Sequence, residues 1–305
     1  MRYKSNETKG GMCMKQQEFL VRAGERVRLK NYDPAFTGKF KSEAEAEARI
    51  RDDRESLAKY QDKLLAEERQ SLLLIFQAMD GAGKDGTIKH VMSSVDPQGC
   101  VVTINEKPGA TELKHDYLWR FVRNLPKRGQ IGIFNRSYYE EVLSTRIHPE
   151  RLEDQQLPPR IRDSPGIWRQ RFQQINNFEQ YLSENGVHVM KFFLHLSKEK
   201  QRERLLERLE VTEKKWKFSM NDVTERARWD EYMSAFEDAL TRTSTKDAPW
   251  YVVPADHRWF SSLVVAELVV AKLKSLNLRY PPVSSDGKKE MERARRLLVR
   301  EEGKS

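Results

Sequence analysis

The chain has 305 residues, 38% hydrophobic and 33% charged, which is enough to bury the core of one large domain, or of one domain with appendages. Its 55 Lys and Arg against 46 Asp and Glu give a net charge of +9, which suits an anionic partner such as nucleic acid, a nucleotide, a phosphate polymer or a membrane surface. The two cysteines, Cys13 and Cys100, exclude a disulfide framework, and no apolar run approaches the roughly 20 residues that cross a bilayer, so we expect a cytoplasmic protein without a membrane partner.

In chain order, the sequence predicts an N-terminal arm, a long helix, and then strands that alternate with helices. The arm, residues 1–40, is polar with scattered Gly and Pro, and residues 42–70 carry leucines at helical spacing. Short apolar runs that we interpret as strands cover residues 72–76, 100–104, 131–134, 189–196 and 251–253. Amphipathic segments that we interpret as helices cover residues 84–94, 111–124, 168–184, 198–209, 223–240 and 262–276.

This alternation predicts an α/β fold: a five-stranded parallel sheet with helices on both faces. We expect one domain over residues 41–280, followed by a polar and basic tail over residues 281–305. Ligands of open parallel sheets bind beyond the carboxyl ends of the strands. The candidate functional residues are therefore those that follow each apolar run.

The first run leads into FQAMDGAGKDGT, residues 76–87, which nearly matches the phosphate-binding loop G-x-x-x-x-G-K-[ST]. Ala78 replaces the first glycine, and Asp85 replaces the Ser or Thr whose hydroxyl holds magnesium. Asp80 offers a carboxylate as a substitute metal ligand. We predict phosphate contacts from the loop and the start of its helix, through Gly81, Ala82, Gly83, Lys84, Asp85, Gly86 and Thr87. The alternative is a Gly-rich strand–helix turn with a chance lysine.

The third run ends in IGIFNRSYYEEV, which places Asn135 at the strand end and Arg136 directly after it. Arg136 is suited to a bidentate phosphate contact, or else it is a surface arginine at a helix end. Glu140 is a further candidate, and a first-turn acid favoured by the helix dipole is its plainer reading.

The helix after the fourth run carries Arg204 and Arg208 on one face, where they could close over a phosphate chain and offset the charge that develops during transfer. The alternative is a salt-bridged surface helix, because glutamates interleave with these arginines. Arg120 is a candidate for an acceptor phosphate, and Lys217, in the basic stretch EKKWKFS, is a further candidate for phosphate binding.

Four motifs occur in order: QAMDGAGKDGTIKHV, IGIFNRSYYEEVL, KKWKFS with ERARWDEY, and TSTKDAPWYVVPADHRW. Over about residues 25–280 the chain thereby resembles the family-2 polyphosphate kinases. The resemblance implies a P-loop nucleotide-kinase-like three-layer sandwich with a helical lid at about residues 198–220. It also implies a reversible, Mg²⁺-dependent phosphotransferase, with Mn²⁺ as a substitute ion, that moves phosphoryl groups between polyphosphate and nucleotides.

The resemblance also assigns roles to individual residues. Asp80 becomes the metal ligand, and the catalytic set comprises Asp80, Lys84, Arg136, Arg204 and Arg208. Nucleotide contacts fall on Asn135, Glu140 and Arg120. Many members carry Asp and Asn at the Asn135 and Glu140 positions, and the subgroup with Asn and Glu there accepts both AMP and ADP. GMP and GDP are further expected acceptors, and a homodimer or homotetramer is the expected assembly.

Two other hypotheses compete with this one. An ATP-dependent nucleoside or nucleotide kinase would use the same fold, although the Asp at position 85 and the basic lid argue against it. A basic nucleic-acid-binding module is compatible with the net charge, but no zinc-finger, RNP-type or heptad pattern supports it.

Overall fold

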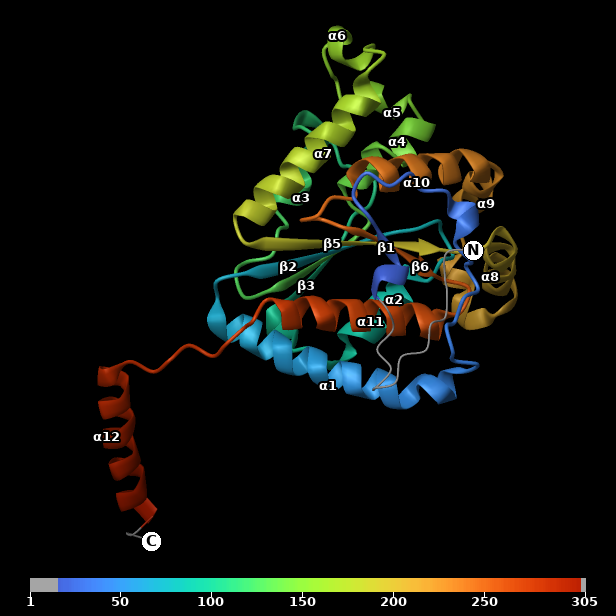
Figure 1. Ribbon diagram of the computed structural model, residues 1–305. Coiled ribbons are helices and arrows are strands. Elements are labelled where there is room, and N and C mark those ends of the chain that lie inside the picture. The colour runs from blue at the N-terminus through green and yellow to red at the C-terminus, as the bar shows by residue number, and fades with distance from the viewer. Residues whose placement is uncertain (1–15, 303–305) are drawn as a thin grey trace.

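The computed structural model describes residues 16–302, and its centre is one six-stranded sheet with the strand order β1-β6-β5-β2-β4-β3 (Figure 1). The strands are β1 (Leu20–Val21), β2 (Ser71–Gln77), β3 (Cys100–Ile104), β4 (Ile131–Asn135), β5 (Val187–His195) and β6 (Trp250–Pro254). The longer helices are α1 (Glu43–Glu67), α2 (Lys84–Val91), α7 (Ile167–Glu184), α8 (Lys198–Glu210), α9 (Met220–Ala227), α10 (Trp229–Thr243), α11 (Arg258–Ser275) and α12 (Ser285–Glu302). The one-turn helices are α3 (Trp119–Val122), α4 (Ser144–Ile147), α5 (Arg151–Asp154) and α6 (Pro159–Arg162).

The five predicted strands are confirmed, and they pair in parallel with one another. The predicted strand number is wrong by one, because β1 pairs antiparallel with β6 at the sheet edge. A strand of two residues inside a polar arm has no periodicity to detect. It forms because Phe19 and Val21 are buried, so residues 16–40 of the predicted arm lie on the body, while residues 1–15 are outside the described residues.

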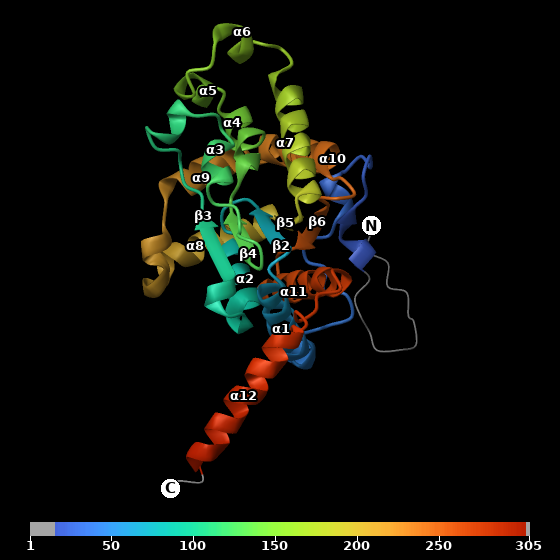
Figure 2. The same cartoon turned by 90° about the vertical axis from the view of Figure 1, so that its left-hand side faces the viewer.

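Helices cover both faces of the sheet, as the strand–helix alternation predicted. Figure 1 shows α1 and α11 below the sheet and α7 and α10 above it, and Figure 2 shows the same layers from the side of β3. Alternate residues of β2 divide between the two cores: Leu72 and Leu74 pack toward α1 and α11, while Leu73 and Ile75 pack toward α7 and α10. β2 is buried along its whole length, so the residues that follow it start from a rigid position.

Two predicted helices are wrong in extent. The segment predicted as a helix over residues 111–124 contains a 3-10 turn at Glu112–Lys114 and then α3, because His115 is extended and the Asp116 carboxylate accepts a hydrogen bond from the Leu118 N–H. The segment predicted over residues 223–240 is two helices, α9 and α10, that meet at Arg228. In both places a local break overrides a helical pattern.

The chain leaves the body after Tyr280, since Leu278 is buried and the Tyr280 hydroxyl donates to Asp62 of α1. α12 stands apart from the sheet and its covering helices in both views (Figures 1 and 2). Within residues 16–302, no helix is long and apolar enough to cross a membrane.

Candidate functional site: a basic cleft beyond the carboxyl ends of the strands

The glycine-rich loop connects β2 to α2 at the centre of the sheet, where the sequence predicted a phosphate-binding loop. Gly81 and Gly83 have φ angles of +86° and +93°, a left-handed conformation that a side chain would strain, and Gly83 is the N-cap residue of α2. Gly86 lies within α2, and a Cβ built there meets no atom within 4 Å. The loop therefore needs glycine at positions 81 and 83 for its backbone, and at Gly86 the adjacent space is open.

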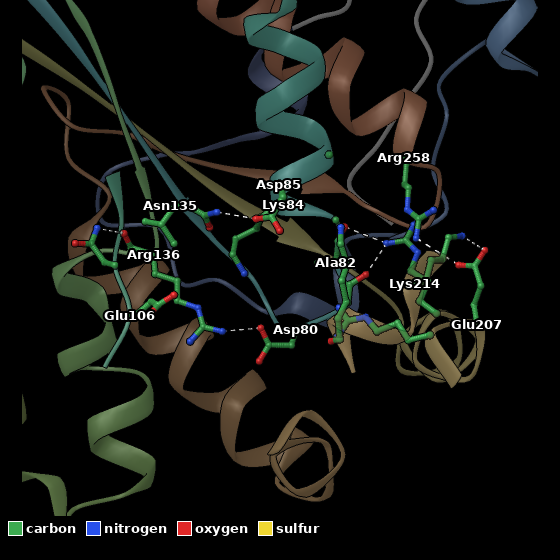
Figure 3. A pocket seen from close by; sticks show the side chains of 18 of the residues that line it. Asp80, Ala82, Lys84, Asp85, Glu106, Asn135, Arg136, Glu207, Lys214 and Arg258 are labelled. Atoms are coloured by element: carbon green, nitrogen blue, oxygen red, sulfur yellow. Dashed lines mark hydrogen bonds and ion pairs between the residues drawn. The ribbon is translucent and has the colours of Figure 1, made fainter. Parts of the chain in front are cut away.

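Lys84 and Asp80 form the charged centre of the loop together with Arg136 (Figure 3). The Arg136 Nη2 donates to the Asp80 Oδ1 at 2.7 Å. Burial raises the pKa of Asp80, but Lys84 and Arg136 outweigh that effect and hold it below its usual value. Burial lowers the pKa of Lys84, against the opposing attraction of Asp80. Asp80 therefore lies between two cations, and the Glu140 carboxylate also attracts both of them.

Asn135 and Asp85, two of the positions where the chain departs from common patterns, are hydrogen-bond partners. The Asn135 Nδ2 donates to the Asp85 Oδ1 at 2.7 Å (Figure 3). The acid at the usual Ser/Thr position therefore faces an amide at the end of β4. A carboxylate at position 135 would repel Asp85, so the two departures compensate for each other.

Arg136 has an unusual backbone. Its φ is +64°, a conformation that costs a non-glycine residue about 1–2 kcal/mol. Its N–H donates to the Phe76 carbonyl at 3.2 Å and its own carbonyl accepts from Asn105 Nδ2 at 2.8 Å. The strained turn is held between β2 and the residue after β3, and it aims the guanidinium at the loop.

The predicted lid helix, α8, is tied to the loop by its inner face. The Gln201 Nε2 donates to the Asp80 carbonyl at 2.8 Å. The two terminal nitrogens of Arg204 donate to four carbonyls at 2.8–3.0 Å, those of Gly81, Ala82, Ala255 and Asp256. Arg204 is therefore engaged with the loop backbone in this structure, and its predicted phosphate contact stays a prediction.

The outer part of the lid carries the remaining basic side chains. Arg208 forms an ion pair with Asp222 of α9 and donates to the Lys217 carbonyl at 3.3 Å. Lys214 pairs with Glu207 across the turn that follows α8. Asp80 and Arg136 also act electrostatically on Asp222, so α9 contributes an acid close to the loop.

These elements enclose a cavity of about 570 Å³ with eight lysines and arginines against four acids in its lining. The basic side chains are Lys84, Lys107, Arg136, Arg204, Arg208, Lys214, Lys217 and Arg258; the acids are Asp80, Asp85, Glu106 and Glu207. A cavity this basic, floored by a glycine loop, is suited to a chain of phosphates.

A second cavity of about 440 Å³ adjoins the first and contains two further predicted residues, Arg120 and Glu140. The Arg120 Nε lies 3.3 Å from the Glu112 Oε1, and burial raises the pKa of the neighbouring Glu141. Tyr117 and Phe121 line its wall. Both cavities include Arg136 in their lining, so this arginine lies where they meet.

The structure thus brings most predicted site residues together, in two groups. Asp80, Lys84, Asp85, Asn135, Arg204, Arg208 and Lys217 line the first cavity, Arg120 and Glu140 line the second, and Arg136 lines both. Thr87 is buried within α2, with its N–H donated to the Gly83 carbonyl.

Some lining residues were missed. Lys107 lies three residues after the end of β3, and Arg258 begins α11 four residues after the end of β6, so inspecting the few residues that follow each strand would have found both. Asp222 carried no such signal, because it reaches the site only through the fold of the lid.

The sheet order, the glycine loop at its centre and a basic cavity beneath a helical lid define the class of this molecule: a P-loop, nucleotide-kinase-like protein.

Comparisons with known proteins give the family. The model of Polyphosphate kinase 2 (PPK2) matches residues 40–281. The chain is 44% identical over 289 residues to the ADP-polyphosphate phosphotransferase of Rhodopseudomonas palustris, a match that covers 95% of this chain and 100% of the relative. It is 40% identical to the AMP/ADP-polyphosphate phosphotransferase of Meiothermus ruber, over 87% of this chain and 95% of that one. The crystal structure of polyphosphate kinase 2 from Arthrobacter aurescens TC1 superposes with a TM-score of 0.82 at 38% identity, covering 92% of this chain and 95% of that chain. The chain belongs to the polyphosphate kinase 2 family.

Proposed function

We propose that the protein transfers the terminal phosphoryl group between inorganic polyphosphate and nucleotides, with AMP and ADP as acceptors. The observation that carries this proposal is the pair of cavities that meet at Arg136: one is basic and lies over the glycine loop, and the other has an aromatic wall. The family membership supports the reaction class. The printed names of the two relatives, one acting on ADP and one on AMP and ADP, support the acceptors.

The chemistry asked of the protein is alignment and charge neutralisation, because phosphoryl transfer requires little covalent participation. We assign the donor phosphates to the loop N–H groups, Lys84 and the lid cations. We assign the acceptor to the second cavity, with Arg120 on its phosphate and Asn135 and Glu140 beside it. Arg136 then contacts the group in transit, since it lines both cavities. GMP and GDP are proposed as further acceptors.

The donor atoms at the loop are compatible with magnesium, or with manganese in its place. Asp80 presents a hard carboxylate oxygen, and Asp85 lines the same cavity. Within residues 16–302 no group of three or more His, Cys, Asp or Glu is arranged to hold a metal, which fits an ion that takes one or two carboxylates and completes its shell with water and substrate phosphates. Such an ion supplies neutralisation of phosphate charge.

The test is a matrix of donors and acceptors: polyphosphate or ATP, each with AMP, ADP, GMP and GDP, with magnesium, with manganese, and with a chelator. We expect ADP and ATP from AMP and polyphosphate, and no product with the chelator. Lys84→Ala should abolish transfer, while Lys89→Ala, an exposed lysine on the same helix, should not. Faster turnover with ATP than with polyphosphate as sole donor would reject the proposal in favour of an ATP-dependent kinase.

We also propose that the protein works in the cytoplasm as a homodimer or homotetramer, as its family resemblance implies. Light scattering on the purified chain measures the assembly directly, and a monomer at working concentration would contradict it.

A further inference from the structure

A buried ion pair lies on the α7 side of the sheet, next to the segment that follows Arg136. Lys191 is on β5, the strand between β2 and β6, and is 0% exposed; Glu179 on α7 is 1% exposed. The Lys191 Nζ donates to the Glu179 Oε2 at 2.5 Å, the Tyr139 hydroxyl at 2.9 Å and the Thr243 carbonyl at 2.7 Å. All three protons of the ammonium group are therefore used.

The other oxygen of the Glu179 carboxylate holds two consecutive tyrosines. Its Oε1 accepts from the hydroxyls of Tyr138 and Tyr139, each at 2.9 Å, and both tyrosines are 0% exposed. These tyrosines begin the 3-10 helix Tyr138–Glu141, so they lie between Arg136 and Glu140 in the chain. The ion pair is thus linked through two hydroxyls to the segment that carries two proposed substrate contacts.

Stability alone is a poor explanation for this arrangement. A buried ion pair loses about as much by leaving water as it gains by attraction, and well-packed apolar side chains of similar volume serve as well or better. An ionic network in a core is instead suited to fixing one geometry, because its donors and acceptors must all be satisfied together.

The backbone turn at Arg136 needs contacts that hold it in one geometry. Arg136 has its positive φ of +64°, and a strained residue keeps its conformation only where the surroundings determine it from several sides. Phe76 and Asn105 hold its own peptide groups. On the C-terminal side, Ser137 caps the 3-10 helix by accepting from the Tyr139 N–H at 3.2 Å, and the tyrosine hydroxyls then connect that helix to Glu179.

We propose that Glu179 and Lys191, acting through Tyr138 and Tyr139, are positioning residues for phosphoryl transfer: they hold the turn that presents Arg136 to the loop and Glu140 to the second cavity. The proposal rests on the function proposed above. Its consequence is that the network can be removed with little loss of folding stability but with a loss of turnover.

The main test variant replaces the network with apolar side chains: Tyr138→Phe, Tyr139→Phe, Glu179→Leu and Lys191→Met together. We expect kcat to fall by up to about 100-fold, the loss that a misplacement of about 1 Å can cause, with a smaller change in the KM of polyphosphate and nucleotide. The thermal midpoint should stay equal or rise. An unchanged kcat in a folded variant would overturn the proposal.

A milder pair of variants separates positioning from packing. Tyr138→Phe with Tyr139→Phe deletes only the two hydroxyls and leaves the ion pair, and it should reproduce most of the loss in kcat. Glu179→Gln with Lys191→Met keeps an acceptor for the tyrosine hydroxyls. Its kcat should therefore be closer to that of the wild type than the kcat of the fourfold variant is. If the hydroxyl-free variant turns over at the wild-type rate, the tyrosine link has no positioning role, whatever happens to the larger variant.

A matched control removes a different ion pair, on the opposite side of the sheet. The Arg49 Nε lies 2.5 Å from the Glu267 Oε1 between α1 and α11, and Arg49→Met with Glu267→Leu should leave kcat unchanged. A crystal structure of the hydroxyl-free variant gives a readout that does not depend on activity. In it, Arg136 should no longer have a positive φ, and its hydrogen bond to Asp80 should be absent. A wild-type protein without transfer activity would reject the proposed function, whereas an unaltered Arg136 in the variant would reject the positioning.

Discussion

At the residue scale, Arg136 is the side chain on which the two cavities converge. Its place directly after a strand was enough to predict a phosphate contact. Its backbone conformation and its ion pair with Asp80 were not predictable, because both depend on β2 and β4 lying side by side. The residue type and its position in the motif therefore indicate that Arg136 contacts phosphate. The order of the strands in the sheet determines that its ion-pair partner is Asp80.

The guanidinium of Arg136 offers a planar pair of hydrogen-bond donors in addition to its charge. Arg136→Lys keeps the charge but loses the planar pair of donors, so we expect kcat to fall about 10- to 100-fold with both acceptors. Steady-state kinetics with polyphosphate and AMP or ADP measure this. Arg146→Lys, in a partly exposed ion pair with Asp238, is the control, and a loss of less than about twofold at Arg136 would show that charge alone suffices there.

At the element scale, the lid is anchored more firmly than its sequence indicated. The pattern of α8 predicted two arginines on one face, but the structure separates their roles: Arg204 binds carbonyls of the loop, and Arg208 pairs with α9. A helical pattern shows which residues share a face, and only the packing shows what that face contacts.

The contact of α8 with the loop gives a prediction for Arg204. A lysine cannot reach four carbonyls at once, so Arg204→Lys should loosen the junction of α8 with the loop and lower kcat/KM about 10-fold or more. Hydrogen exchange should become faster in α8 and in the loop. The exposed Arg202→Lys on the same helix is the control, and unchanged exchange in the Arg204 variant would contradict the anchoring role.

The packing of α1 against α11 gives a prediction for the pH dependence of stability. Asp53 is 3% exposed, and burial, together with the nearby Glu267, raises its pKa to about 7 despite the opposing effects of Arg49 and Lys274. The unfolded chain has a pKa of about 3.9 for this group. The folded state therefore binds the extra proton between about pH 4 and pH 7, and the free energy of unfolding falls as the pH rises through that window, by at most about 1.4 kcal/mol per unit.

Asp53→Asn mimics the protonated acid and should remove this dependence. We expect the variant to match the wild type near pH 4 and to exceed it by about 1–4 kcal/mol at pH 8, measured by urea unfolding. Asp52→Asn, the exposed neighbour on α1, should follow the wild type. Equal pH slopes in the Asp53 variant and the wild type would show that Asp53 ionises normally.

At the scale of the whole molecule, the structure shows where part of the excess of basic side chains lies. Eight cations line one cavity, and they come from the loop, the lid and the residues after β3, β4 and β6. Composition showed an excess of basic residues, whereas only the fold shows that many of them face the same space.

This arrangement predicts a salt dependence. The KM of polyphosphate should rise steeply between about 50 and 200 mM salt, and more steeply than the KM of AMP, because a polyanion releases condensed counterions when it binds. Lys214→Ala and Lys217→Ala should each reduce the logarithmic slope by about one or less. Lys289→Ala, on α12, is the control. A slope no steeper for polyphosphate than for AMP would contradict a phosphate chain in this cavity.

The sequence by itself determined the alternation of strands and helices, the central loop and the family. Each of these depends on local signals: hydrophobic period, glycine spacing and short motifs read in order. Tertiary structure decided what lies close together across long sequence separations. It added the two-residue β1 and paired Asn135 with Asp85. It also brought Arg204 to the loop backbone and Lys191 to the Tyr139 hydroxyl. These contacts follow from the order of strands in the sheet and from burial, which no local pattern records.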